Sequence, residues 1–381
     1  MKNVYLDFSA TTPIDPDVLE SMMPYFSEDF GNPSSIHKHG QTAERAIEDS
    51  RETIARIMGC APAEIIFTSG GTEANNLAIR GTAFEQKLTR NATKILTTPV
   101  EHEAVTKTVN QLQSLHGFEV NLIPVDNTGK VLLDEFAEML GPDVAIVSTI
   151  FGNNEIGTIN PVEKIATLCS EYQIPFHTDA VQALGYIKKI SLNNITMLSA
   201  GAHKFYGPKG VGFLYKQKLH KVFATNTGGS QENNIRAGTH NVPYIVGMAA
   251  ALEKTRLNYS VYANHYTWMR DMIISGVTTI IPGAKVTGSV GDRLCNHASF
   301  VLNGVDGNEL VIALDVLGYS CSSGSACKTG NPEPSGVLLA IGLTPSDAKG
   351  SLRISVGRST TEEEVVGFLK ALSQIVPRLE K

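Results

Sequence analysis

The sequence predicts an α/β fold, with a mainly parallel seven-stranded sheet covered by helices on both faces and a small α+β domain at the C-terminus. Short apolar runs alternate with stretches of helical spacing through about residue 255, which is the pattern of βαβ units. After about residue 260 the elements follow a different order. The chain has 381 residues, 42% hydrophobic and 18% charged, so its composition is globular and it needs no disulfides to fold.

Seven apolar runs are the strand candidates of the larger part: EIIFTS (64–69), KILTTP (94–99), EVNLIPV (119–125), VAIVSTI (144–150), IPFHT (174–178), ITMLSA (195–200) and VGFLY (211–215). Helical patterns lie between them, such as TAERAIEDSRETIARIM (42–58) and NPVEKIATLCSEYQ (160–173). Ligands of parallel sheets bind at the carboxyl ends of the strands. We therefore expect the chemistry on the loops that follow these runs.

The C-terminal part has strands and helices of its own: HASFVLNG (297–304), GNELVIALDVLG (307–318), SLRISVG (351–357) and EEEVVGFLKALSQIV (362–376). The change of pattern predicts two domains. We expect a large domain over residues 15–258 and a small domain formed by residues 1–14 and 259–381.

Charge and cysteine content exclude several classes of protein. The 32 Lys and Arg against 38 Asp and Glu give a net charge of −6 without a basic run, which argues against nucleic acid or an anionic membrane as the main partner. No apolar stretch approaches the ~20 residues of a membrane span, and the N-terminus lacks a signal-peptide pattern. Five scattered cysteines without a CxxC pair, and no HExxH, predict a cytoplasmic protein with no resident metal.

SGGTEANN (69–76) follows a predicted strand and begins a helix. Consecutive glycines let the backbone approach an anion, and the free N–H groups of a helix start favour a phosphate, with Gly71 and Thr72 as donors. The segment is neither a Walker A loop nor a GxGxxG fingerprint. A plain strand-to-helix turn is the alternative.

Three other strand ends carry ionisable groups. Asp179 in HTDAVQ (177–182) can pair with a protonated ring nitrogen of a cofactor such as pyridoxal phosphate, or can cap a helix. Lys204 in AHKFYGPKG (202–210) can form a Schiff base, or can be an exposed loop lysine, which is our interpretation of Lys209. His102 in VEHEAV (100–105) is either functional or a capping and packing residue.

Cys327 lies in SCSSGSACKTGNPEPSG (320–336), a small and polar segment with nothing apolar for the thiol to pack against. An exposed thiol beside Lys328 is a typical setting for a nucleophile. Most other free cysteines are buried small hydrophobes, which is our interpretation of Cys321 and of Cys60, Cys169 and Cys295.

Taken together, these motifs resemble the group I cysteine desulfurases of the NifS/IscS type, which are pyridoxal-phosphate enzymes of fold type I in the class V aminotransferase superfamily. The resemblance runs nearly end to end through YLDFSATTPIDP, FGNPSSIHKHG, SGGTEANN, EHEAV, NNEIG, HTDAVQ, AHKFYGPKG, GGSQENNIRAGT, SSGSAC and LRISVGRSTTEEE. It implies that the large domain binds pyridoxal 5'-phosphate and that the small domain carries the catalytic cysteine loop.

The resemblance also implies roles for the residues around the cofactor ring. Lys204 would hold the cofactor as a Schiff base, and His102 would stack on the ring and take part in proton transfer. Asp179 would pair with the ring nitrogen, and Gln182 would hydrogen-bond the ring hydroxyl.

Phosphate, substrate and sulfur sites follow from the same resemblance. The phosphate ligands would be Gly71, Thr72 and His203, joined by Thr239 of the partner subunit in a homodimer. The substrate carboxylate would lie between Asn154 and Arg353. Cys327 would accept the sulfur, and it would also be the residue able to hold an iron–sulfur cluster transiently.

Two departures from the family pattern affect these expectations. The family has serine three residues before the lysine, where this chain has Gly201, so either the phosphate is held more loosely or a neighbouring hydroxyl such as Ser199 replaces that ligand. The chain ends at Lys381, short of the C-terminal extension on which the iron–sulfur scaffold docks in IscS-type members. The resemblance therefore leaves the acceptor protein open.

The implied reaction is the conversion of L-cysteine to L-alanine, with sulfur passed as a persulfide to an acceptor protein for iron–sulfur cluster assembly or tRNA thiolation. One alternative is another enzyme of the superfamily, a selenocysteine lyase or aminotransferase that does not use the thiol. A non-catalytic scaffold is the alternative outside enzymes, and the presence of both Lys204 and Cys327 argues against it.

Overall fold

The computed structural model describes residues 3–324 and 334–379. Its main sheet has seven strands in the order β2-β8-β7-β6-β5-β3-β4. Strand β8 runs antiparallel to its two neighbours and the other pairs are parallel, which confirms the mainly parallel sheet. Each strand falls within or overlaps a predicted run: β2 (Ile65–Thr68), β3 (Lys94–Thr97), β4 (Glu119–Leu122), β5 (Val144–Ile150), β6 (Phe176–Asp179), β7 (Met197–Gly201) and β8 (Gly212–Lys216).

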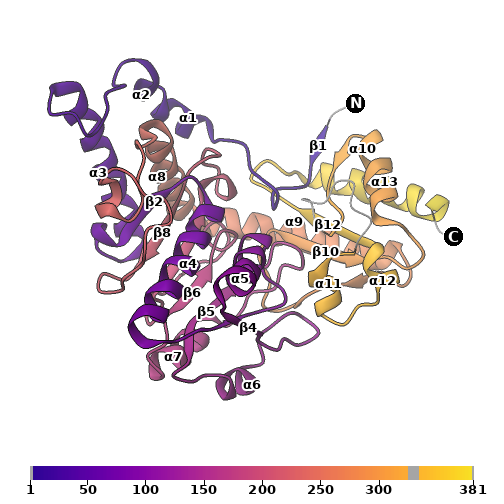
Figure 1. Cartoon of the computed structure of the whole chain (residues 1–381). Helices are drawn as coiled ribbons and strands as arrows, with labels where there is room; N and C mark the ends of the chain where they lie inside the picture. Colours follow the sequence, from indigo (N-terminus) through magenta and orange to yellow (C-terminus); the bar gives the residue numbers. More distant parts are fainter. Residues whose placement is uncertain (1–2, 325–333, 380–381) are drawn as a thin grey trace.

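Helices cover both faces of this sheet (Figure 1). Alternate side chains of a strand point to opposite faces, so Ile65 and Phe67 of β2 join the core cluster that includes residues of α3, α7 and α8, whereas Ile66 joins the cluster that includes residues of α4 and α5. The helices of this part are α1 (Pro16–Met22), α2 (Pro24–Ser27), α3 (Lys38–Met58), α4 (Gly71–Arg90), α5 (Glu103–His116), α6 (Leu133–Glu138), α7 (Val162–Glu171) and α8 (Val242–Leu257).

A second, smaller assembly lies beside the main sheet (Figure 1). Strand β10 (His297–Val301) pairs antiparallel with β12 (Ser351–Ser355) and β9 (Lys285–Val286). The N-terminal strand β1 (Val4–Tyr5) pairs with β11 (Tyr319–Ser320), so the start of the chain lies within the C-terminal part. The helices here are α9 (Tyr259–Ile280), α10 (Gly307–Val316), α11 (Gly336–Ala340), α12 (Pro345–Lys349) and α13 (Glu362–Leu379).

The strand directions decide where functional side chains meet. Because β8 reverses direction between β7 and β2, the carboxyl ends of β2, β7, β6, β5 and β3 all lie at one edge of the sheet. Within the described ranges, the structure contains no helix with the length and apolarity of a bilayer span.

Candidate active site

A cavity of about 560 Å³ opens at this edge of the sheet, between the two assemblies. It brings together nine of the predicted site residues: Gly71, Thr72, His102, Asn154, Asp179, Gln182, His203, Lys204 and Arg353. Thr239 is exposed and does not line the cavity of its own chain. Cys327 lies outside the described residues.

The turn before α4 forms one end of the cavity. Gly70 has φ +152°, a conformation that disfavours side chains, and a Cβ on Gly71 would lie 2.4 Å from Cγ2 of Val181. Glycine is therefore required at position 70 by the backbone conformation, and at position 71 by the close approach of the Val181 side chain. Gly70 has no side chain to cap the first N–H groups of α4, and uncapped N–H groups at a helix start favour an anion.

Asp179 ends β6 and is buried against the cavity floor, with 3% of its surface exposed. Its Oδ1 accepts a hydrogen bond from the backbone N–H of Val181 at 3.0 Å, and its Oδ2 accepts one from Nδ2 of Asn75 at 2.6 Å. Residues 181–186 form turns and no helix lies among the described residues between β6 and β7, so Asp179 caps a turn and the alternative of a helix cap is wrong. Sequence reasoning missed Asn75, although it stands in the same SGGTEANN motif.

Lys204 ends the short 3₁₀ helix η2 (Ala202–Lys204) that follows β7. Its ammonium donates to the backbone carbonyls of Ser9 at 2.5 Å and Ala10 at 2.8 Å, and the side chain lines the cavity. The alternative of an exposed loop lysine is wrong for Lys204, which is partly buried, whereas Lys209 is exposed as expected. The amine is thus held at the cavity wall by two backbone carbonyls.

Contacts of Arg358 with Tyr206 hold the turn that carries Lys204. Tyr206 has φ +68°, an unfavourable conformation for a non-glycine residue. The guanidinium of Arg358 lies 3.9 Å from the centroid of the Tyr206 ring and 4.2 Å from that of Tyr262, and it pairs with Asp15 at 2.9 Å. These contacts tie the C-terminal part of the chain to the lysine turn, and no sequence motif had indicated them.

His102 is the N-cap of α5, as the capping alternative predicts, and it also lines the cavity. Its Nδ1 accepts the backbone N–H of Ala104 at 3.0 Å. Because an acceptor nitrogen carries no proton, the neutral ring has its proton on Nε2. The cap therefore fixes the tautomer as well as the position of this imidazole.

His203 lies next to the turn of Gly71 and is mostly buried. Burial, followed by the positive charges of Lys204 and Lys209 and by His102, lowers the pKa of His203 to about 4. Its Nδ1 is 3.2 Å from Oγ1 of Thr11. At neutral pH His203 is therefore an uncharged hydrogen-bonding partner for a phosphate.

Arg353 on β12 and the backbone of Asn154 form the opposite wall. Only 2% of the Arg353 side chain is exposed; its Nη2 pairs with Oδ1 of Asp7 at 2.8 Å and its Nη1 donates to the Asn154 carbonyl at 3.2 Å. The same carbonyl is 3.1 Å from Nε2 of His297. A buried guanidinium held in this way is suited to bind a carboxylate.

The structure corrects the expectation that Ser199 replaces the missing serine at Gly201. Ser199 is fully buried and its Oγ lies 2.9 Å from Nε2 of His177, below the cavity. Ser199 is absent from the cavity wall, whereas the hydroxyl of Thr11 lies beside His203. Residues 199 and 201 lie on the same face of β7, but Ser199 is two residues deeper in the sheet, where its hydroxyl contacts His177 of the neighbouring strand β6.

Glu101 is a second residue that sequence reasoning missed. It lines the cavity with 5% of its surface exposed, and its Oε1 accepts hydrogen bonds from Thr98 Oγ1 at 2.5 Å and from the N–H of Ile150 at 2.8 Å. Its Oε2 has no hydrogen-bond partner among the described residues. Burial raises the pKa of Glu101 to about 8, so the carboxyl is largely protonated at neutral pH.

This raised pKa makes stability depend on pH. Between the ordinary pKa of 4.5 and about 8, the folded chain keeps a proton on Glu101 that the unfolded chain loses, so the stabilisation falls as pH rises through this window. Glu101→Gln retains the two accepted hydrogen bonds without a titratable group. We expect the free energy of unfolding to fall less between pH 6 and pH 8.5 in the variant, by up to about 3 kcal/mol, in urea titrations. Parallel pH profiles for the two proteins would contradict the assignment.

The four cysteines in the described part of the chain are poor nucleophiles. Cys169 is buried, as expected, and so is Cys321, whereas Cys60 and Cys295 are only partly buried. Burial is the largest cause that raises each thiol pKa, to about 12 for Cys60, Cys295 and Cys321. Little thiolate forms on these residues near neutral pH.

One family model, that of aminotransferase class V, matches residues 4–368. The chain belongs to this family. Curated class V relatives include the cysteine desulfurase IscS of Dictyoglomus turgidum, 44% identical over 99% of this chain and 95% of its own, and the cysteine desulfurase NifS of Azotobacter vinelandii, 39% identical over 100% of this chain and 94% of its own.

Solved class V structures give the same result. A NifS-like protein superposes with a TM-score of 0.92 at 37% identity, covering 99% of this chain and 100% of its own. The protein described as SspA in complex with cysteine has a TM-score of 0.80 at 33% identity, covering 94% of this chain and 99% of its own. This chain is thus a cysteine desulfurase-type member of the class V family.

Class V members use pyridoxal phosphate, and the residues of this cavity fit that group. The Oε1 atom of Gln182 is buried without a hydrogen-bond partner among the described residues, while its Nε2 donates to the Ser9 carbonyl at 2.7 Å. Such an atom is suited to accept a hydrogen bond from a ring hydroxyl. In the same cavity, the Gly71 turn would suit a phosphate, Asp179 a ring nitrogen and Lys204 an aldehyde.

Proposed function

We propose that this chain is a pyridoxal-phosphate-dependent cysteine desulfurase that converts L-cysteine to L-alanine and takes the sulfur as a persulfide on Cys327. The observation that carries the proposal is the cavity itself, in which an amine, a buried carboxylate and a buried guanidinium face a common space. The three groups are Lys204, Asp179 and Arg353.

Each part of the cofactor has a candidate holder. Gly71, Thr72 and His203 would bind the phosphate, Asp179 and Gln182 the ring, and Lys204 the aldehyde carbon. When bound, pyridoxal phosphate supplies an electron sink that stabilises negative charge at the substrate Cα. The Asp179 carboxylate, held by Asn75, would favour the protonated ring nitrogen that this chemistry requires.

Two side chains of the cavity, Lys204 and His102, would transfer protons. The freed amine of Lys204 would remove the Cα proton and later return a proton to the product. His102, with its proton on Nε2, would exchange a proton at the substrate and pack against the ring. Arg353 and Asn154 would hold the substrate carboxylate and so fix which bond of Cα faces Lys204.

The sulfur step needs a nucleophile that the described cysteines do not offer. The Cys327 thiolate would attack the substrate sulfur, so that an S–S bond forms while the C–S bond breaks. The electron pair of the broken bond remains with the carbon, which takes a proton and becomes the methyl group of alanine. Charge and atoms balance as thiolate plus cysteine giving persulfide plus alanine.

The assembly around this reaction is also proposed. We infer a homodimer in which Thr239 of the partner subunit completes the phosphate site, because Thr239 is exposed and does not line the cavity of its own chain. Separate core clusters and sheets support a large domain over 15–258 and a small domain from 1–14 and 259–381. The sulfur would pass to an acceptor protein for iron–sulfur assembly or tRNA thiolation in the cytoplasm.

The test is to incubate the purified protein with L-cysteine, pyridoxal phosphate and a thiol reductant, and to measure alanine, sulfide and pyruvate. Desulfuration gives alanine and sulfide in equal amounts and depends on added cofactor after dialysis against hydroxylamine. Pyruvate in place of alanine, or no product from a protein with bound cofactor, would overturn the proposal.

Gly201 offers a direct test of the phosphate site. A Cβ at this position would lie 3.4 Å from the N–H nitrogen of Gly71 and 3.7 Å from Cδ2 of His203, so a serine fits without displacing either. We expect Gly201→Ser to add a phosphate ligand and to slow cofactor dissociation about tenfold, measured by absorbance after dilution into a trapping amine. Gly201→Ala adds the Cβ alone and is the matched control. Equal rates for both variants would show that the hydroxyl does not reach the phosphate.

A further inference from the structure

Residues 226–240, here called the arm, adopt an energetically unfavourable backbone. Three consecutive non-glycine residues have left-handed conformations: Glu232 with φ +47°, Asn233 with φ +54° and Asn234 with φ +64°. Left-handed conformations are unfavourable for side chains other than glycine and persist where surrounding contacts enforce them. Contacts of this kind are present at Glu232.

Glu232 anchors the arm in the protein interior. It is 6% exposed, and its carboxylate forms a two-pronged ion pair with Arg51 of α3, with distances of 2.8 and 2.9 Å. The backbone N–H of Phe67 in β2 donates to the same carboxylate at 2.9 Å. These hydrogen bonds and the charge of Arg51 lower the pKa of Glu232 to about 2, against the effect of burial. The anchor is therefore charged at all physiological pH values.

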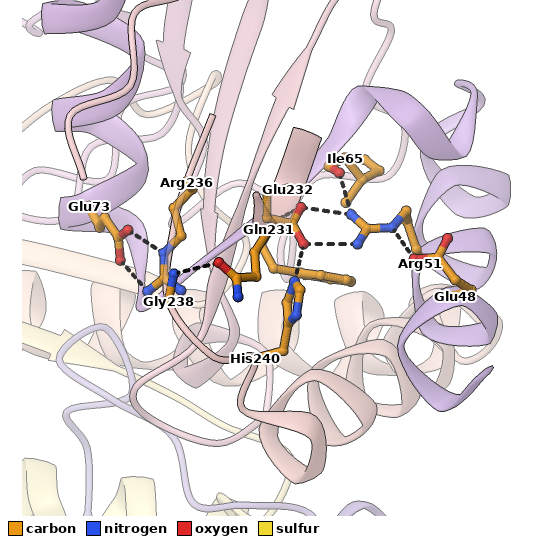
Figure 2. A network of polar contacts seen from close by, with 10 residues as sticks. Glu48, Arg51, Ile65, Glu73, Gln231, Glu232, Arg236, Gly238 and His240 are labelled. Atoms are coloured by element: carbon orange, nitrogen blue, oxygen red, sulfur yellow. Dashed lines mark hydrogen bonds and ion pairs between the residues drawn. The ribbon is translucent and has the colours of Figure 1, made fainter. Parts of the chain in front are cut away.

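The network that starts from this anchor holds both chain neighbours of Thr239 (Figure 2). On one side, Nε2 of His240 lies 2.6 Å from Oε1 of Glu232. On the other side, the N–H of Gly238 donates to Oε1 of Gln231 at 3.1 Å. Thr239 itself is exposed between these two fixed points.

A second ion pair joins the arm to the phosphate-binding turn of the same chain. Arg236 pairs with Glu73 at 2.7 Å, as Figure 2 shows, and Glu73 also accepts from the N–H of Ser69 at 2.6 Å. Glu73 lies in the first turn of α4, directly after Thr72. The arm is thus fixed at Gln231–Glu232, at Arg236 and at His240, and Thr239, which lies between two of these points and is exposed, carries a hydroxyl donor.

We propose that Gln231, Glu232 and His240 are positioning residues that hold Thr239 in place for the cofactor phosphate of a second copy of this chain. This inference rests on the proposed function, because it requires both the cofactor and the homodimer. The physical basis is preorganisation: a hydroxyl whose backbone is already fixed loses little conformational entropy when it binds a phosphate. A loop that only covers the surface requires neither a buried carboxylate such as Glu232 nor a left-handed backbone.

His240→Ala and Gln231→Ala each release one side of Thr239 and leave the Arg51–Glu232 pair intact. We expect the dissociation constant for pyridoxal phosphate, measured by fluorescence titration of the apoprotein, to rise about fivefold to tenfold in each variant. His220→Ala is the matched control, because His220 also lies 2.9 Å from a buried group, Oγ1 of Thr82, but outside the arm. Wild-type cofactor affinity in both arm variants would overturn the proposal.

Hybrid dimers separate a positioning role from a local effect on folding. A dimer with one Lys204→Ala subunit has one subunit that can bind the cofactor covalently, and that site would receive the arm of the Lys204→Ala subunit. Placing His240→Ala on the Lys204→Ala subunit should therefore speed loss of the covalently bound cofactor about fivefold to tenfold, while placing it on the Lys204 subunit should not. An effect confined to the subunit that carries the change would overturn the proposal. A wild-type protein that is monomeric by sedimentation, or binds no cofactor, would instead refute the proposed function and this inference with it.

Discussion

Replacing Lys204 by alanine should reduce alanine formation from L-cysteine by about 10³–10⁴-fold, because the variant loses the group proposed to remove the Cα proton. The ammonium of Lys204 donates to two backbone carbonyls of residues 9 and 10 and fills no core position, so the fold should persist. The measurement is initial alanine release at saturating cofactor, together with the absorbance of bound cofactor. The variant should bind the cofactor without the covalent link, so denaturation should release all of it.

A matched control is Lys188→Ala, which removes an exposed lysine from a loop away from the cavity. It should keep activity within about twofold of the wild type, as is usual for surface substitutions. Added methylamine offers a second control, since a small amine can occupy the space left by the Lys204 side chain. Full activity of Lys204→Ala, or a covalent cofactor bond that survives the change, would refute the role of this lysine.

Cys327→Ser should give a loss of at least about 100-fold in alanine formation while the cofactor stays bound. A serine hydroxyl is almost entirely un-ionised at neutral pH and cannot form a persulfide, whereas a thiol of ordinary pKa is a few per cent thiolate. The check is alanine release combined with detection of protein-bound persulfide by mass spectrometry after a single turnover. We expect the persulfide on the peptide that contains Cys327 in the wild type and no persulfide in the variant.

Cys60→Ser is the control for Cys327, because burial raises the pKa of the Cys60 thiol to about 12 and holds it un-ionised. That variant should form alanine and persulfide at the wild-type rate. Equal alanine from Cys327→Ser and the wild type would exclude sulfur transfer to this thiol. A persulfide found on another cysteine would reassign the acceptor within the chain.

The sequence by itself was sufficient for the sheet, since continuous apolar runs such as VAIVSTI (144–150) predict strands buried on both faces, and β5 is buried at all seven positions. It also placed the functional side chains on the loops after the strands. Element ends were less well predicted: α3 begins at Lys38, earlier than the pattern from 42, because His37 caps it through the N–H of Gly40. The last helix continues to Leu379 through Pro377, although proline disfavours a helix interior.

The candidate site was likewise predicted only in part from the sequence. Local motifs identified Lys204, Asp179 and His102, because each follows a strand and carries reactive groups in an unusual setting. Asn75 and Glu101 were missed, because their importance lies in partners that are distant along the chain, such as Asp179 for Asn75 and the N–H of Ile150 for Glu101. A sequence pattern records spacing along one element and contains no record of which loops become neighbours.

Two facts depended on the tertiary structure alone. Ser199 turned out to be buried against His177, so it cannot stand in for the missing serine. Both chain neighbours of Thr239 proved to be held, by Gln231 and by Glu232, and Thr239 does not line the cavity of its own chain. Sequence periodicity determines which residues are buried, since hydrophobic burial follows the local repeat of each element. Hydrogen bonds and ion pairs are short-ranged and directional, so they are decided once folding brings distant segments within about 3 Å.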